Sequence, residues 1–116
     1  MNIEELREYC LSKPGTSEGF PFDEKVLVFK VLGKIFILTS IDSHPLSFNA
    51  KCDPEKAVDL RGRYDSIKPG YHMNKQHWNT IVVDGSVPKK LVTELIDHSY
   101  ELIKNSLPKK QRDTLN

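Results

Sequence analysis

The sequence predicts an α+β fold, in which helices pack on one face of an antiparallel sheet and the elements follow the order α-β-β-β-α-β(β)-α. Two β-branched and aromatic runs, at 26–32 and 35–41, are separated by only two residues. A gap that short holds a hairpin turn and no crossover helix, which excludes a doubly wound parallel sheet. Apolar residues recur at helical spacing near both ends of the chain, and helices segregated from strands are typical of α+β folds.

The first element is expected to be a helix capped by Asn2, because Asn2 and Glu5 have the spacing of a capping box. Its inward apolar stripe consists of Ile3, Leu6 and Cys10. A loop is expected over 13–25, and it contains Phe20 and Phe22. Because burial of a large aromatic side chain is favourable, at least one of the two is expected to pack at the edge of the core.

The strands are expected to begin with a hairpin. The runs 26–32 and 35–41 flank Gly33-Lys34, and a two-residue Gly-X loop suits a type II′ turn. A third strand is expected near 46–51, after a second turn. Both faces of the first two strands carry large apolar side chains, so helices must cover one face.

The second half of the chain reads as helix, strand and helix. Asp53-Pro54 is a helix opening, with Asp as the cap and Pro at the first helical position. Residues 80–84 form the clearest strand of the segment that follows. The last helix is expected from near Pro88 to about Ser106, and the polar tail after it is expected to fray. Side chains expected to be buried on its inner face are Leu95, Ile96 and Leu102.

Composition favours one cytoplasmic domain spanning residues 1–116. The 38% content of hydrophobic residues is near that of globular domains, and the net charge of +1 provides no global attraction for nucleic acid. Cys10 and Cys52 are too few for a disulfide scaffold and fit a reducing compartment. No apolar run approaches the roughly 18 residues of a membrane span, and the first residues lack the apolar region of a signal peptide.

The densest cluster of chemistry-bearing side chains is the segment 68–80, KPGYHMNKQHWNT. Aromatic rings stack on bases, Lys and His contact phosphates, and Asn contacts base edges or fixes a loop. A purely structural loop is the alternative, in which Tyr71 and Trp78 enter the core while His72 and Asn74 bond the backbone. The candidate nucleic-acid-binding residues are Lys68, Tyr71, His72, Asn74, Lys75, His77 and Trp78.

Enzymatic interpretations are weak, and no catalytic residue is predicted. Asp97, His98 and Ser99 are consecutive on a helix, where side chains point about 100° apart and cannot converge. Cys52 precedes a helix N-terminus, which lowers a thiol pKa, but a lone Cys at a strand end is expected to pack. The five-residue spacing of the two histidines in 68–80 misses that of a helical zinc pair, so no metal or other cofactor is expected.

A second concentration of positive charge lies at the end of the last helix, in the acid-free run containing Lys104, Lys109, Lys110 and Arg112. Cations at a helix C-terminus interact favourably with the helix dipole, so a solvated helix end explains part of this pattern. A phosphate contact is the alternative explanation.

Several motifs together resemble the MmcQ/YjbR family of small bacterial proteins. They are E-x-x-PF at 18–22, VFKVLGKIF at 28–36, KCDPEKAVDLR at 51–61, PGYHMNKQHWNT at 69–80 and LIDHSYELI at 95–103. The resemblance covers nearly the whole chain, and the motif at 69–80 is long and unusual. Asp23 departs from the pattern, since a Gly is expected after the PF, and this concerns only the turn of that loop.

The resemblance implies a CyaY/frataxin-like α+β fold, described as a double wing, and a DNA-binding function. The frataxin likeness also suggests iron through an acidic first helix, but this helix offers only Glu4, Glu5 and Glu8 with Arg7 among them, so iron is not expected. We therefore expect a non-enzymatic protein, a monomer or weak homodimer, with DNA as partner, no membrane and no cofactor. The alternatives are a protein- or small-ligand-binding module, or an enzyme with Cys52 or His72 as reactive group.

Overall fold

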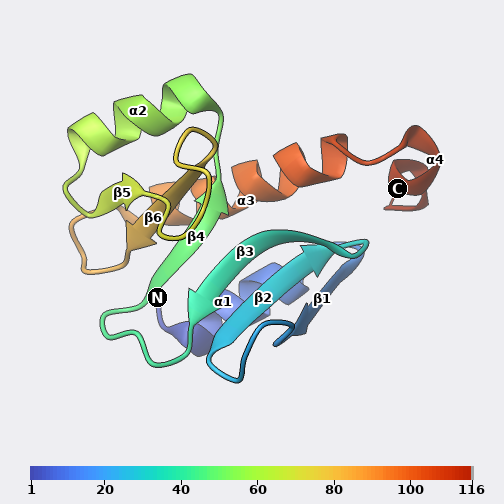
Figure 1. The fold of residues 1–116 in the computed structure, drawn as a ribbon, viewed down its shortest axis with the longest axis horizontal. Helices are drawn as coiled ribbons and strands as arrows, with labels where there is room; N and C mark the ends of the chain where they lie inside the picture. Colours follow the sequence, from blue (N-terminus) through green and yellow to red (C-terminus); the bar gives the residue numbers. More distant parts are fainter. Residues whose placement is uncertain (116) are drawn as a thin grey trace.

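Figure 1 shows the computed structural model, which describes residues 1–115 as a six-stranded antiparallel sheet with its helices packed on one face. Neighbouring strands follow the order β1-β2-β3-β4-β6-β5. The predicted fold class and the broad order of helices and strands are confirmed. The elements are α1 (Ile3–Leu11), β1 (Thr16–Gly19), β2 (Val26–Val31), β3 (Lys34–Ser40), β4 (Ser47–Lys51), α2 (Pro54–Arg63), β5 (Ile67–Pro69), β6 (Trp78–Val82), α3 (Lys89–Asn105), α4 (Lys109–Arg112) and the 3₁₀ helix η1 (Asp113–Leu115).

One hydrophobic core joins the sheet to α1, α2 and α3. Successive strand residues point to opposite faces, so one alternating set reaches the helices. Its fully buried members include Phe29, Ile37, Phe48 and Ile81. We call the other side of the sheet the open face, because α1, α2 and α3 all contribute to the core on the first side. Side chains that alternate onto the open face include Lys30, Leu38, Asn49, Lys51, Lys68, Trp78 and Thr80.

The predicted helix caps are confirmed. Asn2 accepts a hydrogen bond from the backbone N–H of Glu5, whose side chain accepts from that of Asn2, which completes a capping box. Asp53 accepts from the N–H of Lys56 at the start of α2. On α3, Leu95 and Ile96 are buried as predicted, but Leu102 is only half-buried. The buried stripe passes beside it through Val92, Ser99, Tyr100 and Ile103.

The hairpin between β2 and β3 turns one residue earlier than predicted. Val31 pairs with Lys34, so the central residues are Leu32 and Gly33 rather than Gly33 and Lys34. Both have positive φ, 47° and 85°, which is the pattern of a type I′ turn and not of the predicted type II′. A bulge between Phe29 and the next residue shifts the register of the same pair of strands.

Residues 13–25 are not wholly a loop, because β1 forms within them and pairs with β2. The prediction that Phe20 or Phe22 packs at the core edge is wrong. Their side chains are 49% and 65% exposed, in the connection that β1 makes to β2. Since β1 ends at Gly19, these residues lie beyond the end of that strand.

The tail after α3 does not fray as predicted. It forms α4 and η1, and Leu115 packs against the core. Its side chain lies so close to Gly15 that a Cβ there would overlap it, and Leu32 borders the same position. Gly15 also has a φ of 74°, a left-handed conformation that favours glycine.

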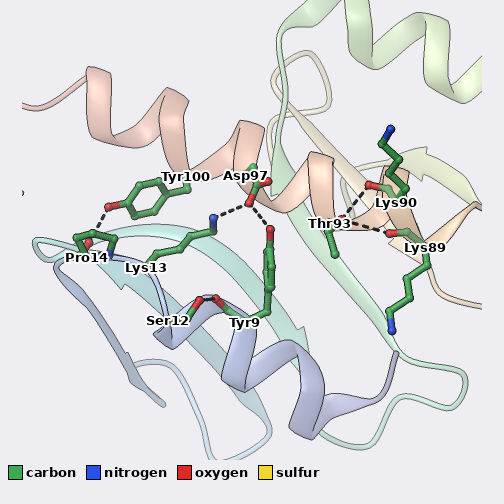
Figure 2. A network of polar contacts seen from close by, with 9 residues as sticks. All are labelled: Tyr9, Ser12, Lys13, Pro14, Lys89, Lys90, Thr93, Asp97 and Tyr100. Carbon is green, nitrogen blue, oxygen red and sulfur yellow. Dashed lines mark hydrogen bonds and ion pairs between the residues drawn. The ribbon is translucent and has the colours of Figure 1, made fainter.

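A polar network fastens α1 and the turn that follows it to α3 (Figure 2). Tyr9 donates a hydrogen bond to Asp97 over 2.6 Å, and Lys13 pairs with the same carboxylate oxygen. Burial, followed by the hydrogen bond to Asp97, raises the pKa of Tyr9 to about 12. Tyr100 donates to the carbonyl of Pro14 over 2.6 Å. Within residues 1–115, no helix has both the length and the apolar character needed to span a membrane.

Candidate functional site

The connection between β5 and β6, residues 70–77, folds back over the open face instead of extending from the sheet edge. Tyr71 follows the edge strand β5, yet its carbonyl accepts a hydrogen bond from Asn49 Nδ2, 3.1 Å away on β4. The N–H of Tyr71 donates to Thr80 Oγ1 on β6 over 3.0 Å, and Thr80 in turn donates to Asn49 Oδ1. The loop, yellow in Figure 1, therefore lies across β6 toward β4.

Further hydrogen bonds fix the far end of this loop. Arg61 of α2 donates to the carbonyl of Lys75 over 3.0 Å. The N–H of Cys52 donates to the carbonyl of His77 over 2.8 Å. Inside the loop, Asn74 Oδ1 accepts from the N–H groups two and three residues later. Hydrogen bonds therefore fix the loop both where it crosses the sheet and at its far end, next to α2.

Gly70 allows the chain to pass under Trp78. It is buried, and a Cβ at this position would lie 2.8 Å from Trp78 Cβ and 2.9 Å from the Trp78 carbonyl oxygen. The N–H of Gly70 donates to that carbonyl, and its own carbonyl accepts from Lys75 Nζ over 3.2 Å. A side chain at position 70 would therefore displace backbone, not only a flexible group.

The structure brings the predicted site residues into one surface region with differing exposure. Tyr71 is 70% exposed, so the alternative that places it in the core is wrong for this residue. Its ring lies 4.0 Å from that of His72, which has a φ of 57°. Asn74 has the structural role that the same alternative assigns to it. Lys68, Tyr71, His72, Asn74 and Lys75 are exposed, whereas His77 and Trp78 are half-buried.

Asn49 and Lys51, beside the loop, were not predicted as part of this region, and Thr80, the last residue of the predicted segment 68–80, was not among its candidate binding residues. Lys51 pairs with Trp78, and Asn49 pairs with Thr80, which pairs in turn with Lys68. All of them alternate with buried strand residues. This alternation can be recognised in the sequence and places these side chains on the opposite face from the buried ones. Which strand lies beside which cannot be read from one sequence.

The consecutive residues Asp97, His98 and Ser99 contact three different parts of the fold, as predicted. The Asp97 carboxylate accepts a hydrogen bond from Tyr9 of α1. His98 Nε2 accepts from the N–H of Asp53 over 3.1 Å, which requires the neutral form at that nitrogen. Burial, followed by the nearby charge of Lys56, lowers the pKa of His98. Ser99 lies between β3 and β4. Within residues 1–115, no three His, Cys, Asp or Glu side chains are grouped so that they could hold a metal ion.

Cys52 is expected to react slowly with alkylating reagents. Its side chain is 3% exposed, and burial raises the pKa of the thiol to about 11. Because the thiolate is the nucleophile, little of the reactive form exists at neutral pH. Iodoacetamide labelling of folded protein at pH 7, followed by mass spectrometry, should be slow at Cys52 and become complete in denaturant. Rapid labelling of the folded protein would favour the enzyme alternative.

A shallow cleft of about 480 Å³ lies beside the loop, between it and α2. It is lined by Pro54, Glu55, Val58, Arg61 and Gln76. Val58 is 62% exposed, and Arg61 is the residue that holds the Lys75 carbonyl. The cleft therefore borders the same surface region as the exposed side chains of the loop.

Comparisons with known proteins identify a family whose members are similar to this chain over most of its length. A sequence model of the YjbR family matches residues 11–102. The chain is 35% identical to the uncharacterised protein YjbR of Escherichia coli K12 over 115 residues, which is 99% of this chain and 98% of that protein. It is 36% identical over 109 residues to the uncharacterised protein YbdF of Escherichia coli O157:H7, covering 94% and 89% of the two chains.

Two solved structures share the fold. Protein DR2400 of Deinococcus radiodurans, with a domain described as DUF419, has a TM-score of 0.93 at 42% identity, over 98% of this chain and 87% of that one. A protein from Pseudomonas syringae has a TM-score of 0.76 at 27% identity, over 89% and 99% of the two chains.

Proposed function

The chain belongs to the YjbR family, as its motifs predicted, and we propose that it is a DNA-binding protein that contacts DNA through residues 68–80. The observation that carries this proposal is Tyr71, 70% exposed in a loop fastened over the sheet, with Lys68 and Lys75 exposed around it. An exposed aromatic ring beside lysines matches what nucleotides present, a flat base and a charged phosphate.

Each side chain would have a distinct part in such a contact. Lys68 offers its ammonium to a phosphate, and Lys75 has donors left after its bond to the Gly70 carbonyl. Tyr71 offers a ring on which a base stacks, and the half-buried Trp78 offers a ring edge or face next to it. Asn74 shapes the loop. We further propose that the protein acts by binding rather than as an enzyme.

The proposal is tested by titrating labelled DNA, single-stranded and duplex, at about 50 mM salt and above, where phosphate contacts are still strong. Lys68→Ala is expected to weaken binding to all sequences alike and to lower the slope of log K against log[salt] by about 0.7 to 0.9. Affinity should be modest, because the chain carries a net charge of only +1.

The matched control for this variant is Lys90→Ala. Lys90 is an exposed lysine in the first turn of α3, so its removal changes net charge equally but away from the loop. It should leave the slope unchanged. A folded protein that retains neither form of DNA at low salt would contradict the proposal, and equal effects of the two variants would contradict the assigned site.

A second candidate function is favoured by a separate observation, the exposed pair Phe20 and Phe22. Two aromatic side chains, 49% and 65% exposed on one short connection, are typical of surfaces that bind proteins. If the protein is a protein-binding module, then Phe22→Ala should abolish partner capture and Lys68→Ala should not.

A further inference from the structure

We infer that the DNA bound by this protein is single-stranded, and that its path continues from the 68–80 loop across the open face to Lys51 and Lys30. The inference rests on the proposed function and deepens it, because it names the form of the nucleic acid and adds residues outside the loop. Sheet register, charge, loop geometry and the number of available cations support it.

The register places a strip of mainly polar side chains on the open face, in which Asn49 and Thr80 also bond the loop that lies over them. Lys68 of β5 pairs with Thr80 of β6, and Thr80 pairs with Asn49 of β4. Two residues further along the same two strands, β4 and β6, Trp78 pairs with Lys51. Neighbouring strands are about 4.8 Å apart, so these side chains from three strands lie within the length of a few nucleotides.

Lys30 lies on the same face beyond β3, whose own side chain on that face next to Asn49, Leu38, is apolar. Lys30 lies on β2, where it alternates with the core residues Phe29 and Val31 and therefore points to the open face. β2 and β4 are separated only by β3, which puts their backbones about 10 Å apart. Lys51 and Lys30 are thus spaced to contact separate phosphates of one strand.

The charges of this face are uncompensated. The ion pairs found within residues 1–115 engage Lys13, Lys25, Lys89 and Lys104, but none of them engages Lys30, Lys51 or Lys68. The strand residues of the open face from β2 to β6 include no Asp or Glu. A polyanion approaching these strands meets lysines with no strand carboxylate among them, which is the charge complementarity that the proposal requires, while Glu55 borders the loop from the cleft on the α2 side.

The number of cations decides between single strand and duplex. Tight duplex binders neutralise roughly six to ten phosphates, whereas this face offers Lys30, Lys51 and Lys68, with Lys75 at its border. Single-strand binding needs fewer phosphate contacts, because each base stacked on an aromatic side chain adds about 1 to 3 kcal/mol of binding free energy, which is about 5- to 150-fold in affinity. Tyr71 and Trp78 supply two such rings in the strip.

The loop geometry also disfavours entry into a groove. A recognition element must project from the protein to reach base edges in a duplex. Here Asn49 holds the Tyr71 carbonyl and Arg61 holds that of Lys75, so the loop lies flat on the sheet and against α2. Bases of a single strand are already accessible and can reach a ring presented on such a flat surface.

The experiment compares a labelled oligothymidine of about 12 nucleotides, a length in the range of known single-strand sites, with a duplex of the same length at the same salt. We expect at least about tenfold tighter binding of the single strand, with quenching of the single tryptophan, Trp78. Duplex binding equal to or tighter than this overturns the inference while the proposed function stands. Absence of binding to both probes overturns both.

Two matched pairs of variants test the path. Lys51→Ala and Lys30→Ala should each lower the salt slope for oligothymidine by about 0.7, and Lys90→Ala should not. Tyr71→Ala should weaken binding about 5- to 150-fold without changing the slope. Phe22→Ala removes an equally exposed aromatic ring, 65% exposed, from a connection outside the strip and should have no effect. Unchanged binding by Lys51→Ala and Lys30→Ala confines the site to the loop and overturns the extended path.

Discussion

Leu95→Ala is expected to lower the free energy of unfolding by about 2 to 5 kcal/mol, which is the range for truncating a leucine buried in a protein core. Leu95 is 3% exposed on α3, which lies against β3 and β4. The loss combines the transfer free energy of the deleted methyl groups with the cavity left between helix and sheet. Urea unfolding followed by circular dichroism measures it.

Leu102→Ala is the matched control for this variant. The same atoms are deleted from the same helix, but Leu102 is half-buried and beside the inner stripe. Its loss should be nearer to about 1 kcal/mol. Equal losses at the two positions would contradict the orientation of α3 described here.

Ser99→Ala is expected to cost a similar amount, about 2 to 6 kcal/mol, although it deletes a single oxygen. The Ser99 hydroxyl donates to the carbonyl of Phe36 on β3 over 2.6 Å and accepts from the N–H of Lys51 on β4 over 2.9 Å. The β3–β4 ladder ends one pair earlier, at Ile37 and Ala50. A helical serine thus supplies the bond that the two strands no longer make with each other.

Ser99 is 0% exposed. Alanine at this position therefore leaves the Phe36 carbonyl and the Lys51 N–H without their hydrogen-bond partner in a buried site. Each unsatisfied buried group costs about 1 to 3 kcal/mol, which gives the expected total. Ser12→Ala is the control, since Ser12 is exposed and bonds only a carbonyl of its own helix. Hydrogen exchange at the Lys51 amide should accelerate in Ser99→Ala alone. Stability equal to that of the control would contradict the bridging role.

The parts of the fold that were predictable are those fixed by local chemistry. The capping box of Asn2 and Glu5 and the Asp53-Pro54 opening of α2 involve residues within one turn of each other, and sequence spacing identifies them directly. The type of the hairpin turn was harder to predict from the sequence. The predicted turn centred on Gly33-Lys34 is wrong because Leu32 adopts a positive φ, which a residue with a branched side chain rarely does.

The other errors concern contacts between segments that are distant in the sequence. Leu115 packs near Gly15, a hundred residues away, so the polar composition of the tail gave no sign of its order. The exposure of Phe20 and Phe22 likewise depends on where β1 ends relative to the helices. In the candidate site, segment 68–80 stood out by composition, but its neighbours Asn49 and Lys51 could be found only from the pairing of β4 with β6.

The two outer strands of the sheet restrict how copies of this chain associate. β1 has four residues and β5 has three, and β5 ends in Pro69, which has no N–H to donate. Adding a foreign strand to a sheet draws its strength from a row of main-chain hydrogen bonds, and edges this short offer few of them. Growth of the sheet from one molecule into the next, the route by which exposed edges give rise to fibrils, is therefore opposed by the length and the residues of both edges.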